Sequence, residues 1–169
     1  MKIDWDSIDC HKWFMESPEY PTFLKNFGEI LSTAPRLFHV QPQPFSPSIL
    51  ASAPCTEVAV FFKTKDEYVG LVEKFVECLK GVDGYLGHCF GDVIEEIEKV
   101  EGDGKGKAVL LYIGWTSREA HLRFRETETF KKNVGILNEG MGGLEQVSFR
   151  VLVWVVLCVD FGLIVSCSF

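Results

Sequence analysis

Residues 108–124, AVLLYIGWTSREAHLRF, decide the fold because they hold a strand, the start of a helix and the corner between them. The run from Ala108 to Trp115 is almost wholly apolar, which is typical of a buried strand. Ser117 is well placed as the N-cap of a helix, and Glu119 in the first turn suits the helix dipole. The stretch therefore predicts a strand that turns directly into a helix.

The segments on either side complete an order of elements. Residues 57–63, EVAVFFK, predict a strand, and Thr64 with Glu67 forms a capping box for a helix. A glycine-containing extended segment, GYLGHCFGDVIEEIE at 84–98, and a hairpin turn lead into the central strand, and QVSFRVLVWVV at 146–156 predicts the last strand. The order β-α-β-β-α-β predicts an α+β fold of the ferredoxin-like type, with four antiparallel strands and both helices on one face.

A second copy of the corner lies near the N-terminus. WDSIDCHKWF at 5–14 and WTSREAHLRF at 115–124 share tryptophan, serine, histidine and phenylalanine at the same spacing. Because tryptophan and histidine are rare, this agreement indicates two duplicated units, of which the first keeps only its second half. The predicted divisions are a partial ferredoxin-like unit at 1–40, a Pro/Ser-rich linker at 41–54, a complete unit at 55–156 and an apolar tail at 157–169.

Composition excludes several classes of protein. The net charge is −7 and the basic residues do not cluster, which argues against a nucleic-acid partner. The six cysteines form no CxxC pair and follow no secretory signal, so we expect reduced thiols, a cytoplasmic protein and no metal site. Asp160 in the middle of the last apolar stretch disfavours a membrane span. For the tail at 157–169, native ordered structure, a membrane anchor and translated intron sequence all stay open.

The element order, the GYLG…FG second strand and the W-x-S-x-x-x-H-x-x-F helix start resemble the dimeric α/β-barrel superfamily. Within it, the chain is similar to antibiotic-biosynthesis-monooxygenase-like (ABM) domains of tandem fungal proteins, with the first repeat truncated. The resemblance implies a small hydrophobic or aromatic ligand, no cofactor, and activity as a monooxygenase or cyclase on aromatic polyketide-like substrates. A non-catalytic or truncated relative with an association role only is the alternative.

The resemblance also implies that two sheets pack into a barrel, with a pocket between the sheet and the helices of each unit. The first repeat lacks half of its unit and cannot close that barrel. Because an apolar sheet face would then be exposed, we expect a homodimer or another form of self-association.

Candidate catalytic residues follow from the same corner. His121 lies one turn into the predicted helix, where the dipole favours a neutral imidazole able to act as a general base. The alternative is that His121 and Trp115 form a structural junction. His88 and Tyr112, on neighbouring strands, are the other catalytic candidates; the structural alternatives are a histidine at a sheet edge and a buried tyrosine with a satisfied hydroxyl. The predicted substrate-binding residues, each of which also has a structural explanation, are Trp115, Phe124, Tyr85, Phe90 and Arg123.

Overall fold

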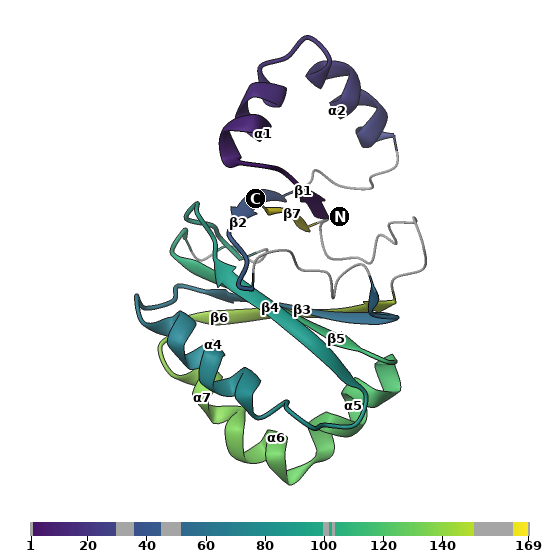
Figure 1. Ribbon diagram of the computed structural model, residues 1–169. Coiled ribbons are helices and arrows are strands. Elements are labelled where there is room, and N and C mark those ends of the chain that lie inside the picture. Colours follow the sequence, from purple (N-terminus) through teal and green to yellow (C-terminus); the bar gives the residue numbers. More distant parts are fainter. Residues whose placement is uncertain are drawn as a thin grey trace. The chain divides into compact units, whose positions relative to one another are not determined.

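The computed structural model describes residues 2–29, 36–44, 52–99, 102, 104–150 and 164–168, and the chain divides into two units (Figure 1). The N-terminal unit consists of Met1–Val40 together with Val156–Phe169. The C-terminal unit consists of Gln41–Val155.

The C-terminal unit has a four-stranded sheet in the order β4-β5-β3-β6. All neighbouring strands in it are antiparallel, and the helices lie on one face (Figure 1). This arrangement confirms the predicted α+β, ferredoxin-like fold. In chain order the elements are β3 (Cys55–Phe62), α4 (Tyr68–Glu77), β4 (Tyr85–Asp92), β5 (Ala108–Trp115), α5 (Arg118–Glu126), α6 (Glu128–Asn133), α7 (Gly135–Asn138) and β6 (Gly143–Arg150).

Helix α4 begins later than the predicted capping box would have it. Its N-cap is Glu67, which makes no side-chain cap bond. Thr64 instead donates its backbone N–H to the carbonyl of Lys107 at 3.1 Å, and it is buried. The capping box at Thr64 is therefore wrong, because the backbone there still continues the pairing that joins β3 to β5.

The predicted cap of α5 is confirmed, although the helical stretch after it is divided. Ser117 is extended at φ −163° and its hydroxyl accepts from the backbone N–H of Ala120 at 3.1 Å. Thr127 then leaves the helical conformation with ψ 153° and caps α6 through Phe130 N–H at 3.2 Å. A Ser/Thr N-cap thus starts each of these two helices.

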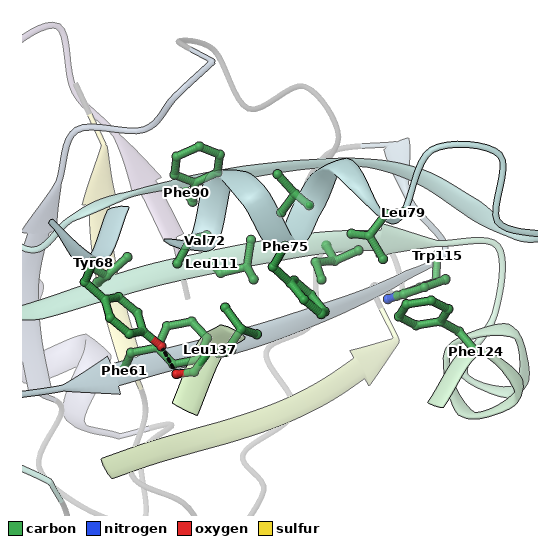
Figure 2. Packing of buried hydrophobic residues seen from close by; sticks show 14 of the residues in the cluster. Phe61, Tyr68, Val72, Phe75, Leu79, Phe90, Leu111, Trp115, Phe124 and Leu137 are labelled. Carbon is green, nitrogen blue, oxygen red and sulfur yellow. Dashed lines mark hydrogen bonds between the residues drawn. The ribbon is translucent and has the colours of Figure 1, made fainter. Parts of the chain in front are cut away.

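Apolar side chains fill the space between the sheet and the helices (Figure 2). Tyr68 of α4 is fully buried, and its hydroxyl donates to the carbonyl of Leu137 at 2.6 Å, which ties α4 to α7. At the other end of the same cluster Trp115 packs beside Phe124 (Figure 2). Burial of side chains of this size stabilises the fold by about 1.5–3 kcal/mol each.

The second face of the sheet is apolar too. Strand alternation turns Val58, Val60, Phe62, Leu110 and Tyr112 away from the helices. These side chains are at most 7% exposed. The expected self-association rests on this apolar face and stays a prediction.

The N-terminal unit has a three-stranded sheet in the order β1-β7-β2, in which β7 runs parallel to both neighbours. Its elements are β1 (Lys2–Asp4), α1 (Ile8–Met15), α2 (Tyr20–Gly28), β2 (Arg36–Val40) and β7 (Ile164–Ser168). Residues 164–168 of the predicted tail thus form a strand, while 151–163 lie outside the described residues. No helix in the described part of the chain is long and apolar enough to cross a membrane.

Candidate functional site

The corner between β5 and α5 is an aromatic cluster. Trp115 ends β5, and its ring stacks on His121 with centroids 5.5 Å apart and 22° between the planes. Phe124, one turn further along α5, lies 5.4 Å from Trp115. Trp115 is fully buried and His121 is 3% exposed. The three predicted residues of the corner are therefore in contact, in the interior of the unit.

A buried carboxylate lies at the centre of this corner. Glu57 on β3 is 6% exposed. Trp115 Nε1 donates to its Oε2 at 3.1 Å, and His121 Nε2 is 3.2 Å from the same oxygen. Gln146 of β6 donates to Oε1. Three N–H groups thus replace the water that a buried carboxylate has lost.

Burial sets the charge of His121. Loss of hydration lowers the pKa of His121, and the Glu57 carboxylate opposes this shift. A neutral imidazole with its proton on Nε2 fits the contact with Glu57. These observations favour the structural junction, with a carboxylate as the partner of the imidazole.

A second polar pair lies on β4, the strand at the edge of the sheet. The hydroxyl of Tyr85 is 2.5 Å from His88 Nδ1, and the two rings stack with centroids 6.2 Å apart. Residues three apart would lie on opposite faces of a regular strand. A bulge between Tyr85 and Gly87 changes the register and brings both side chains to one face. Both residues are partly exposed, unlike His121.

The pKa values of this pair keep both groups neutral near pH 7. Burial lowers the pKa of His88. Burial, together with the charge of Glu77, raises the pKa of Tyr85. In the tautomer with the proton on Nδ1, His88 donates to the phenol oxygen and its Nε2 carries an unprotonated lone pair. The pair therefore combines a weak base with a phenol that still has its proton.

Gly84 allows the start of β4 to lie close to the corner between β5 and α5. It has φ +80°, and a Cβ there would lie 2.5 Å from Ala120 Cβ. Its carbonyl accepts from Thr116 N–H at 2.8 Å. This close approach places Tyr85 edge-on to Trp115, with ring centroids 6.1 Å apart.

Two of the predicted site residues lie elsewhere. Tyr112 pairs with Cys89 on β4, one position from His88, so it points to the second face of the sheet. Arg123 lies on the surface of α5, where it pairs with Asp83 at 3.2 Å with both side chains mostly exposed. The other predicted residues form a row of rings that runs through Phe90, His88, Tyr85 and Trp115. His121 and Phe124 each contact the Trp115 end of this row.

The N-terminal corner has the same local geometry. Trp5 stacks on His11 with centroids 4.6 Å apart and lies 5.5 Å from Phe14. Ser7 has φ −160° and caps α1 by accepting from Cys10 N–H at 3.2 Å. The hydrogen bonds at its centre differ from those around Glu57.

Polar partners distinguish the two corners. His11 Nδ1 is 2.7 Å from His39 Nε2, and both imidazoles are buried. The indole nitrogen of Trp5 is buried and has no hydrogen-bond partner among the described residues. Within that same part of the chain no group of three His, Cys, Asp or Glu side chains could hold a metal ion.

The comparisons with known proteins concern the fold. No protein-family model and no curated protein matches the chain. Among solved structures, an anthrone oxidase-like protein aligns with a TM-score of 0.63 at 19% identity, over 88% of this chain and 69% of that chain. The two proteins share a fold.

Other neighbours in structure are ABM-like proteins. SnoaB, a cofactor-independent oxygenase from Streptomyces nogalater, aligns with a TM-score of 0.44 at 14% identity, over 60% of this chain and 96% of that chain. An antibiotic biosynthesis monooxygenase aligns with a TM-score of 0.41 at 16% identity, over 59% of this chain and 99% of that chain.

Proposed function

We propose that the protein binds a small aromatic molecule and oxidises it without a cofactor, at the Tyr85–His88 pair. The observation that carries this proposal is the 2.5 Å contact between the Tyr85 hydroxyl and His88 Nδ1, in a partly exposed position. Tyr85 and His88 are the partly exposed rings of the aromatic row, and a flat ligand would stack on these two. The anthrone oxidase-like neighbour supports an anthrone, an aromatic polyketide type, as the substrate.

In this proposal His88 is the general base. Its Nε2 removes a proton from the acidic ring methylene of the anthrone, while Nδ1–H donates to Tyr85. The Tyr85 hydroxyl donates to the substrate oxygen on which negative charge develops. The carbanion then reduces molecular oxygen. Overall the methylene loses two hydrogens and becomes a carbonyl with one atom of the dioxygen, and the other atom leaves as water.

His121 has a positioning role in the same proposal. Its 3% exposure and its contact with Glu57 leave it inside the core, away from any ligand. Tyr112 and Arg123 stand outside the site, on the second sheet face and on the surface of α5. Trp115 and Phe124 are as buried as His121, so in this assignment they support Tyr85 from within the core.

We also propose that residues 1–40 are the second half of a duplicated unit of the tandem fungal type, in a cytoplasmic and self-associating protein. The matching stacks of Trp5 on His11 and of Trp115 on His121 support the duplication. Light scattering tests the self-association, and a monomer at all concentrations would contradict it.

Single substitutions test the activity. His88→Gln should lower the rate of anthrone-dependent oxygen uptake by about 10²-fold or more, because it removes the base. Tyr112→Phe is the matched control on the opposite face and should leave the rate unchanged. Quenching of tryptophan fluorescence by the anthrone measures binding separately. Normal turnover by His88→Gln would refute the mechanism, and no binding across a panel of anthrones would favour the non-catalytic alternative.

A further inference from the structure

The central strands of the two units run in opposite directions relative to their neighbouring strands. Strands β1 and β2 precede and follow its two helices, as β5 and β6 precede and follow α5–α7 in the C-terminal unit. In both units one strand lies between these two, β7 in the first and β3 in the second. β3 is antiparallel to both neighbours, whereas β7 is parallel to both.

The central strand of the N-terminal unit, β7, has no carboxylate at the position that corresponds to Glu57 on β3. On β3, Glu57 is opposite Ile113, two residues before Trp115, and it accepts the indole N–H of that tryptophan. On β7, Cys167 is opposite Ile3, which stands two residues before Trp5. The Trp5 indole N–H is buried without a partner among the residues described. Among the described residues, the N-terminal corner therefore has the indole donor but no acceptor for it.

We propose that the centre of the N-terminal sheet is a docking site for an extended, antiparallel segment that carries a glutamate between alternating apolar residues and displaces β7. The backbone of such a segment would pair with β1 on one side and β2 on the other. Its glutamate, opposite Ile3, would accept the Trp5 indole N–H. Two features favour the exchange, because a parallel ladder is slightly less stable per residue than an antiparallel one, and a carboxylate accepts a stronger hydrogen bond than a neutral group.

This site is independent of the Tyr85–His88 pair, so its test needs no activity. The probe is a peptide with the sequence Ala53–Lys65, which contains β3, with Cys55→Ser to prevent oxidation. It is titrated into the full chain labelled with ¹⁵N at the tryptophan indoles. Trp5→Phe assigns the Trp5 signal. We expect binding with a downfield shift of the Trp5 indole proton, and about tenfold weaker binding of the matched Glu57→Gln peptide.

A second variant distinguishes displacement of β7 by the peptide from binding of the peptide at another surface. Ser166→Pro removes a ladder N–H from β7, so it should bind the glutamate peptide more tightly than the wild-type chain does. If this variant does not fold, the wild-type titration decides alone. Equal affinity for the two peptides, absence of binding, or binding without a shift at Trp5 would each overturn the proposal.

Discussion

Replacing Glu57 by glutamine should destabilise the C-terminal unit by about 2 kcal/mol. The buried carboxylate accepts from Trp115 Nε1, and His121 Nε2 is 3.2 Å from the same oxygen. A hydrogen bond to a charged acceptor contributes about 1.5–3 kcal/mol, against about 0.5–1.5 kcal/mol for a neutral one. The loss is therefore about 1 kcal/mol for each of the two buried donors. Gln146 is exposed and adds little.

Thermal unfolding followed by circular dichroism measures this effect. For a unit of this size, about 2 kcal/mol corresponds to a fall in Tm of about 8 °C. Glu67→Gln is the matched control, since Glu67 is exposed and its side chain makes no cap bond, and its effect should stay within about 0.5 kcal/mol. Hydrogen exchange at β5 should accelerate only in Glu57→Gln. Unchanged or increased stability of Glu57→Gln would refute the reasoning that the carboxylate holds the corner together.

Three further predictions concern the C-terminal unit. Tyr68→Phe leaves the Leu137 carbonyl without its donor and should cost about 1–3 kcal/mol in urea unfolding; an unchanged midpoint would contradict this. Gly84→Ala places a Cβ at φ +80° against Ala120 and should cost about 1–3 kcal/mol, seen as a lower Tm, whereas a wild-type Tm would show that the turn relaxes freely. Burial lowers the pKa of His88 from 6.5, so its contribution to stability is complete above pH 6.5 and is lost as the pH falls toward the lower value of the folded state. The stability of the wild type relative to His88→Gln should therefore decrease from pH 7 to pH 5, and a pH-independent difference would exclude the shift.

The order of elements could be predicted because each strand and cap is local in the sequence. The apolar run that ends at Trp115 and the hydroxyl of Ser117 each specify one element without long-range information. The start of α4 could not be predicted in this way, because Thr64 can either cap a helix or extend the strand pairing. Its backbone pairs with Lys107, a partner 43 residues away, and this pairing prevails over the capping box.

The candidate site was only partly predictable, because the register between β4 and β5 decides which side chains share a face. The aromatic residues were recognisable by type, but the face to which each points depends on the bulge at Gly87 and on the pairing of β4 with β5. The sequence predicts Tyr112 and His88 on neighbouring strands, but the register of β4 with β5 turns Tyr112 to the other face. Glu57 was missed, although a carboxylate among the inward-facing residues of an apolar strand was a signal that it has a buried partner.

Glu57 has a consequence for strand alignment. Strands β3 and β5 are apolar on both faces, so hydrophobic contacts alone would tolerate a slip of one residue between them. Such a slip would move the carboxylate to the face of Val58 and Val60, away from the indole and imidazole that now receive it. A single charge in this strand thus penalises the misaligned sheet far more than it stabilises the correct one, and it selects one pairing from several that the apolar residues would allow.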